Sequence, residues 1–108
     1  MERIYNKLVR DNIPNIIKSN NEECVVTILN DTEYKKALEE KLLEELNEVI
    51  ESNSSERIEE LANMIEVITS LAKLEGKTLN DVINVASKKK EKRGGFDNKI
   101  FLEKVITK

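Results

Sequence analysis

Four oxygen-bearing side chains recur at helical spacing in the middle of the chain. Glu45 and Glu48 are three residues apart, and Glu60 is followed three residues later by Asn63. Side chains at this spacing lie on one face of a helix. The chain contains no histidine, so carboxylate and amide oxygens are the available ligands, and these favour magnesium or manganese. The pattern predicts a site that holds a hard divalent cation and, through it, a phosphate chain.

The missing histidine also excludes several classes of enzyme. Ser-His-Asp and Cys-His catalysis and ordinary zinc sites all need imidazole, and the chain has none. Hydrolysis by a water molecule that a cation or a carboxylate activates remains available.

The two acidic pairs fall on two successive predicted helices. The first runs from capping residues at 30–32 to about Glu51, and the second runs from Ser54 or Ser55 to Gly76. Helices joined by so short a polar turn usually pack antiparallel. The glutamates of both helices would then converge near the turn.

Apolar stripes give each of these helices a side to bury. The first stripe consists of Leu38, Leu42, Leu46, Val49 and Ile50, and the second consists of Ile58, Leu61, Ile65, Ile68 and Ala72. Beyond the second stripe lie Met64, Val67, Leu71 and Leu74. Glu60 shares this widened side, where a carboxylate is costly unless a cation or hydrogen bonds compensate. The excess apolar surface also predicts a homodimer or a larger homo-oligomer.

Most acidic residues on such helices are ordinary solvated surface. The segment from Glu39 to Glu66 carries ten acids against only Lys41 and Arg57, and charged residues are rarely buried. Only convergence across the turn distinguishes Glu45, Glu48 and Glu60 from the others.

Length and composition predict a single all-α domain over residues 1–108. Charged residues make up 36% of the chain and aromatic residues 4%, with three glycines and one proline, too few for a turn-rich β-sandwich. Cys24 is the single cysteine and has no internal disulfide partner. With no secretory or transmembrane segment in the sequence, we expect a cytoplasmic protein that does not bind membranes.

The remaining segments complete a bundle of about four helices. Residues 12–19 are weakly helical, and a capping box of Thr78 and Asp81 opens a long helix that runs through Lys92. The β-branched segments 24–29 and 99–106 read as strands that could form a short two-stranded ribbon.

The end of the last predicted helix is strongly basic. It carries Lys88, Lys89, Lys90, Lys92 and Arg93, followed by Gly94, Gly95 and Phe96. One interpretation is a solvated helix end whose cations suit the helix dipole. The other is a phosphate clamp, in which Arg93 offers forked donors and the glycines allow close approach of the backbone. Nucleic acid is a weaker partner, because the net charge is −3 and the acidic helices would repel a polyanion.

Four motifs in order along the chain resemble a known family. They are KLVRDNIP from Lys7 to Pro14, Glu45-x-x-Glu48, the run ELAN from Glu60 to Asn63, and the run RGGF from Arg93 to Phe96. Together they look like the MazG-like all-α nucleoside triphosphate pyrophosphohydrolases, in particular the phosphoribosyl-ATP pyrophosphohydrolase-like branch. The resemblance extends from Tyr5 to about Leu102. It implies a helical homo-oligomer that uses magnesium to cut a nucleoside triphosphate, in many cases a noncanonical one, into monophosphate and pyrophosphate.

The same resemblance implies roles for individual residues. Glu45, Glu48 and Glu60 would bind the metal, and Asn63 stands where the family usually has aspartate. An amide offers a carbonyl oxygen to a cation but no negative charge, so metal affinity or rate should be lower than in relatives. Glu44 and Glu45 are the candidates for the carboxylate that takes the proton.

The implied substrate-binding residues lie at both ends of the chain. At the basic end they are Lys89, Lys92, Arg93, Gly94, Gly95 and Phe96. Lys7 and Arg10 are additional candidates, and their alternative is to tie down the N-terminal segment through surface ion pairs.

Two other functions remain open at the level of sequence. The first is a catalytically inactive binding or regulatory protein that keeps the fold and has lost its chemistry through Asn63. The second is a nucleic-acid-associated protein that uses the run from Lys88 to Arg93.

Overall fold

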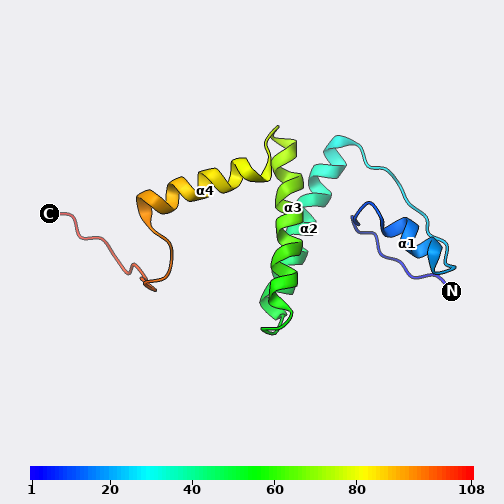
Figure 1. Cartoon of the computed structure of the whole chain (residues 1–108), viewed down its shortest axis with the longest axis horizontal. Coiled ribbons are helices and arrows are strands. Elements are labelled where there is room, and N and C mark those ends of the chain that lie inside the picture. The colour runs from blue at the N-terminus through cyan, green and yellow to red at the C-terminus, as the bar shows by residue number, and fades with distance from the viewer.

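Two long antiparallel helices form the centre of the molecule. These are α2 (Asp31–Glu51) and α3 (Arg57–Leu74), flanked by the short α1 (Ile13–Ser19) and by α4 (Leu79–Arg93). The computed structural model describes all residues from 1 to 108 and contains no strand. The predicted all-α class with about four helices is therefore confirmed (Figure 1).

Capping chemistry explains where two of the helices begin. The Asn30 side chain accepts a hydrogen bond from the Glu33 amide at 2.8 Å, and the Glu33 carboxylate accepts one from the Asn30 amide at 3.3 Å. Thr78 and Asp81 form the same reciprocal box at the start of α4, at 3.2 and 2.9 Å. The box at Thr78 and Asp81 was predicted as such, whereas for α2 the sequence predicted a cap at residues 30–32 without the reciprocal bond of Glu33.

The start of α3 differs from the prediction that Ser54 or Ser55 caps it. Its N-cap residue is Glu56, which makes no side-chain capping bond. The turn is organised instead by Asn53, whose side-chain oxygen accepts hydrogen bonds from the amides of Ser55 and Glu56, both at 3.1 Å. At its other end α3 stops before Gly76, whose φ of +70° is a conformation that glycine adopts at little cost.

The two predicted strands do not form. Residues 24–29 and 99–106 adopt no regular structure, and they lie toward opposite ends of the long axis of the molecule (Figure 1). Val25 is 100% exposed and Phe101 86%. β-branched composition favours a strand only where a partner strand and a packing face exist, and neither segment has them here.

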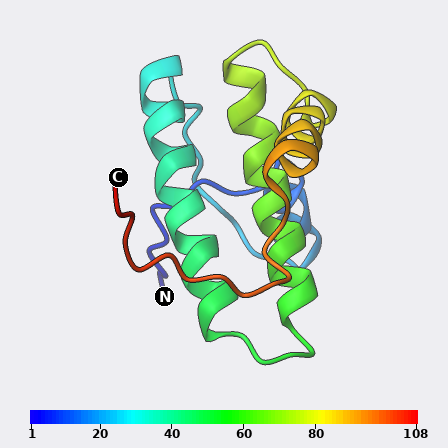
Figure 2. The ribbon, with the colours of Figure 1, turned by 90° about the vertical axis from the view of Figure 1, so that its left-hand side faces the viewer.

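The hairpin of α2 and α3 (Figure 2) buries little apolar surface. Its buried apolar residues are Leu38, Val67 and Ala72. Val67 belongs to the widened side of α3 and Ala72 to the end of the expected main stripe, so the buried surface of α3 draws on both. Ile58 and Ile65 of the expected stripe are 73% and 49% exposed. The reason is that α3 is apolar over more of its circumference than a single neighbouring helix covers.

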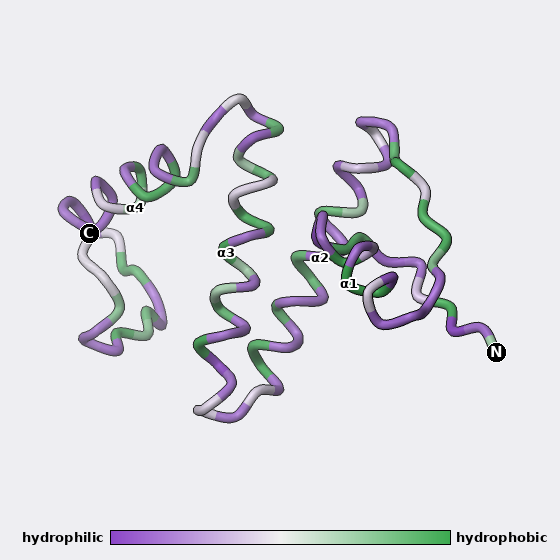
Figure 3. The backbone as a smooth tube through the Cα atoms, turned by 45° about the vertical axis from the view of Figure 1, so that its right-hand side comes forward, coloured by the Kyte–Doolittle hydropathy of each residue, from purple (hydrophilic) through white to green (hydrophobic).

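The chain is extended for its length. Its radius of gyration is 18.8 Å and its extents are 67 × 34 × 23 Å, whereas a compact domain of this size has a radius of gyration of about 13 Å. α4 projects from the hairpin along the long axis (Figure 1). Hydrophobic residues also occur throughout the segments outside the hairpin (Figure 3). None of the helices has the length and apolar composition needed to cross a membrane.

Candidate metal centre

Glu45 is the one charged residue that the fold buries. It lies seven residues, or about two turns, after the buried Leu38, so both point from α2 towards α3. Glu45 is only 6% exposed, and its Oε2 atom has no hydrogen-bond partner. Burial of an uncompensated carboxylate is costly. The sequence analysis identified Glu60 as the acid with apolar neighbours. In the structure Glu60 is only half-buried, and Glu45 is the acid that is buried.

Three carboxylates converge at the end of the hairpin near the turn. Each of Glu45, Glu48 and Glu60 contributes one oxygen atom to a group in which all three lie within 4.8 Å of one another. Glu48 is nearly one turn after Glu45 on α2, and Glu60 is in the first turn of α3. The antiparallel packing therefore brings together the acids that the sequence analysis selected. A divalent cation is the ligand that three such oxygen atoms suit best.

The electrostatics of the cluster show mutual repulsion. The pKa of Glu48 is raised, first because its carboxyl group shares a hydrogen bond with Glu60 and then because of the negative charge of Glu60. Burial and the charges of Glu45 and Glu44 add to the effect. Like charges that share a site disfavour ionisation, and a bound cation would remove that penalty.

Glu44 has a different environment from the cluster. Its Oε1 atom lies 3.1 Å from Lys7 Nζ and 3.5 Å from Lys41 Nζ. Burial raises the pKa of Glu44, but the hydrogen bond from Lys7 and the charges of Lys41 and Lys7 outweigh it, so the net shift is downward. A carboxylate with a lowered pKa is a weaker proton acceptor. These contacts tie Glu44 to two ammonium groups, and the choice between Glu44 and Glu45 as the proton acceptor stays a prediction.

Asn63 connects the cluster to the N-terminal segment. Its Oδ1 atom accepts a hydrogen bond from Arg10 Nη2 at 2.9 Å, and its Nδ2 atom donates one to Glu60 Oε2 at 3.4 Å. The amino group of the amide therefore faces the cluster, while the carbonyl oxygen expected to bind the metal faces Arg10. In this conformation Asn63 lies beside the carboxylates but offers no oxygen atom to a cation that they would bind.

Lys41 is a member of the site that the sequence analysis missed. Its ammonium group lies 3.5 Å from Glu44 Oε1 and 3.6 Å from Glu45 Oε1. The signal was available, because Lys41 precedes these glutamates by three and four residues, which is the spacing of helical ion pairs. Lys41 offsets part of the negative charge that the buried Glu45 brings.

The basic end of α4 lies away from the carboxylates of the same chain. α4 follows the far end of α3, and from Glu60 to Leu74 that helix rises about 21 Å at about 1.5 Å per residue. At the basic end of α4 a shallow hollow is lined by residues from Arg93 to Ile100. A separate hollow beside the carboxylate cluster is lined by Glu48, Glu51, Ser52, Glu56 and Glu60. Phe96 is 98% exposed, and Gly94 has a φ of +83°. A single chain therefore does not bring the carboxylate cluster and the predicted phosphate-binding residues of α4 together.

Comparison of the chain with models of protein families, with curated proteins and with solved structures finds no match. The resemblance to the MazG-like family thus depends on the four motifs, and two of them, Glu45-x-x-Glu48 and the run from Glu60 to Asn63, supply the residues that meet at the candidate metal centre.

Proposed function

We propose that this chain is a magnesium- or manganese-dependent pyrophosphohydrolase of nucleoside triphosphates, of the MazG-like type. The observation that carries the proposal is the buried Glu45, whose free Oε2 atom has no partner and whose neighbours within 4.8 Å are two further carboxylates. The donor set fits a hard divalent cation, because it consists of oxygen atoms with negative charge.

Each residue of the cluster has a role in this proposal. Glu45, Glu48 and Glu60 hold the cation, which supplies neutralisation of the phosphate charge and activation of water when it is bound. Lys41, 3.6 Å from Glu45 Oε1, offsets part of the charge of Glu45 before the cation binds. Lys7, whose side chain is 53% exposed, can leave Glu44 for a phosphate oxygen.

A second copy of the chain completes the proposed assembly. The outer side of α3 exposes Ile58, Leu61 and Ile65 at 73%, 41% and 49%, more apolar surface than a small stable monomer normally leaves open. The acidic hairpin and the basic end of α4 are complementary in charge. Because the two are apart in one chain, the residues from Lys89 to Phe96 would reach a triphosphate on the cluster from the partner copy.

Pyrophosphate release over a panel of standard and modified nucleoside triphosphates, with magnesium, tests the function. The proposal expects equal amounts of monophosphate and pyrophosphate from at least one member of the panel. Release of orthophosphate alone would contradict cleavage between the α and β phosphates. Nucleotide binding without any turnover would favour the inactive binding protein, and binding of single-stranded nucleic acid without either would favour the nucleic-acid-associated protein.

A further inference from the structure

The hydrogen bonds that join Arg10, Asn63 and Glu60 form a continuous chain into the metal centre. Arg10 donates to Asn63 at 2.9 Å, and Asn63 donates to Glu60 at 3.4 Å. We infer that Arg10 and Asn63 are positioning residues: they orient the Glu60 carboxylate for the cation, and neither binds the cation or the triphosphate directly. The inference deepens the proposed function and depends on it.

The chemistry of the three groups fixes the orientation of the amide. A guanidinium group has only donors, an ionised carboxylate has only acceptors, and an amide has one end of each kind. Only one orientation of Asn63 satisfies both neighbours, with its oxygen towards Arg10 and its amino group towards Glu60. An amide that turned to offer its oxygen to the cluster would place its amino group against the donors of Arg10.

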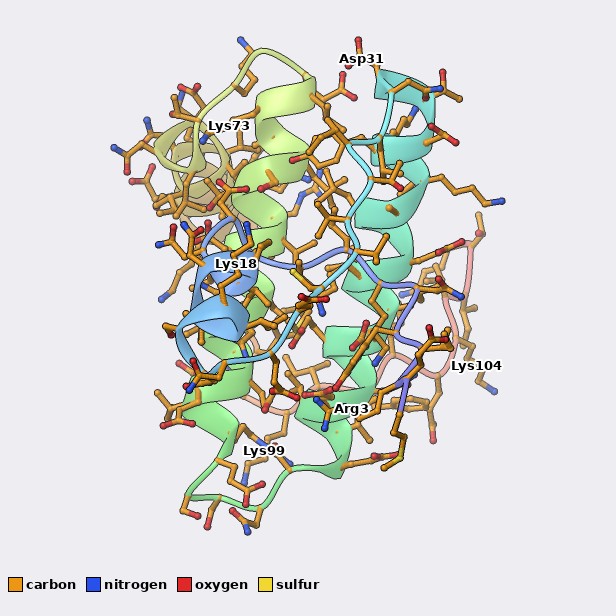
Figure 4. The ribbon with its side chains drawn as sticks, turned by 90° about the vertical axis from the view of Figure 1, so that its right-hand side faces the viewer. Arg3, Lys18, Asp31, Lys73, Lys99 and Lys104 are labelled. Atoms are coloured by element: carbon orange, nitrogen blue, oxygen red, sulfur yellow. The ribbon has the colours of Figure 1, made fainter.

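The fold holds the outer end of this chain of hydrogen bonds in place. Arg10 comes from the segment before α1, 53 residues away from Asn63 in sequence. The same segment is attached to α2 by Lys7, which donates to Glu44 at 3.1 Å. Figure 4 shows α1, which carries Lys18, on the side of the hairpin that faces the viewer; the helix itself makes no close contact with α2 or α3, so the segment is attached through its side-chain bonds. Arg10 therefore reaches α3 from a segment that is itself fixed to α2.

Charge and orientation predict opposite effects when Arg10 is removed. The positive charge of a guanidinium group close to the cluster opposes the binding of a metal ion there. The loss of that charge alone would therefore tighten metal binding. Loss of the hydrogen bond would release Asn63 and Glu60 and weaken metal binding. Outer partners of metal ligands contribute about tenfold or more to affinity. The sign of the change thus separates the two effects.

The experiment is a calorimetric titration with Mn²⁺ alone, in the absence of nucleotide. Arg10→Lys keeps a donor and the charge, while Arg10→Met has similar length and neither. We expect Arg10→Lys to bind Mn²⁺ nearly as tightly as the wild type and Arg10→Met about tenfold more weakly. Asn63→Leu should weaken binding to a similar extent, and the double variant Arg10→Met/Asn63→Leu should be no weaker than Asn63→Leu.

Each other outcome overturns a specific claim. Unchanged or tighter Mn²⁺ binding by Arg10→Met, with the helical circular dichroism of the wild type, would overturn the positioning role. Arg10→Met that weakens only triphosphate binding would make Arg10 a substrate ligand instead. If Arg10→Met fails to fold, wild-type Mn²⁺ affinity in Asn63→Leu overturns the inference by itself. A wild-type chain that binds no Mn²⁺ would overturn the proposed function, and the inference with it.

Discussion

Glu48 is the residue whose ionisation reports most directly on the carboxylate cluster. Its pKa is raised by its shared hydrogen bond with Glu60 and by the charge of that neighbour. A glutamate whose folded pKa exceeds its ordinary value of 4.5 gives stability that is complete below that value and is lost as the pH rises through the folded pKa. At neutral pH the ionised Glu48 therefore destabilises the metal-free fold.

Glu48→Gln should remove this pH-dependent loss. In EDTA at pH 7 we expect the variant to melt at a higher temperature than the wild type, and at pH 4 we expect the two to melt together, because both then carry an uncharged side chain. Thermal unfolding followed by circular dichroism makes the measurement, with the exposed Glu39→Gln on the same helix as control. A variant that melts below the wild type at pH 7 would show that Glu48 does not experience net repulsion.

Asn63 is the residue where this chain differs from the resembling family. In Asn63→Asp a carboxylate oxygen takes the place of the amino group that now faces Glu60, while the other oxygen still accepts from Arg10. A charged oxygen binds a hard cation better than an amide does. We expect Asn63→Asp to tighten Mg²⁺ binding and to raise the rate of hydrolysis, measured by calorimetry and by pyrophosphate release. No change in either quantity would place position 63 outside the metal centre.

The individual helices were predictable where their determinants are local. The capping bonds at Asn30 and Thr78 join residues three apart, and the sequence located the start of both helices, with a capping box predicted at Thr78. The side of α3 that packs on α2 was not predictable, because Ile65 and Val67 belong to two apolar faces and only the packed structure distinguishes them. The prediction of two strands was wrong for a related reason. A strand needs a second segment to pair with, and local sequence does not show whether a distant segment lies beside it.

The candidate site was predictable to the same degree. The spacing of Glu45, Glu48 and Glu60 and the short turn were sufficient to predict that they converge. The burial of Glu45 depends on how α2 is rotated against α3, and the contact of Arg10 with Asn63 joins residues 53 apart. Neither can be deduced from local spacing.

Arg93, in the last turn of α4, tests whether the basic end of this helix binds phosphate. Arg93→Ala should weaken the binding of a nonhydrolysable triphosphate by about 1.5–3 kcal/mol, the range for hydrogen bonds to charged groups, with a smaller effect on monophosphate. Calorimetric titration measures both, and Lys18→Ala, which removes a basic residue from the last turn of α1, is the matched control. Equal triphosphate affinity in wild type and Arg93→Ala would leave residues 88–93 as a solvated helix end.

At the scale of the whole molecule, the extended shape and the exposed apolar side of α3 predict self-association. With a radius of gyration of 18.8 Å and three buried apolar residues, the single chain has a small core. We expect light scattering at micromolar concentration to give a mass well above the 12.4 kDa of one chain. Ile65→Glu should reduce that mass towards the monomer, because it places a charge on the outer side of α3. Lys73→Glu, at a polar position of the same helix, should not.

A wild-type mass of 12.4 kDa would contradict this prediction and would leave the basic end of α4 without a route to the carboxylates. A high mass that Ile65→Glu leaves unchanged would move the interface to another surface.

The central claim is that the three carboxylates support hydrolysis through a divalent cation, and one assay tests it most directly. Pyrophosphate release from the preferred triphosphate should require Mg²⁺ or Mn²⁺ and should fall at least about a hundredfold in Glu60→Gln, a loss of roughly 2.7 kcal/mol in transition-state stabilisation. The variant should remain folded, as circular dichroism would show. Full turnover of the wild type in excess EDTA, or undiminished turnover by Glu60→Gln, would contradict the account.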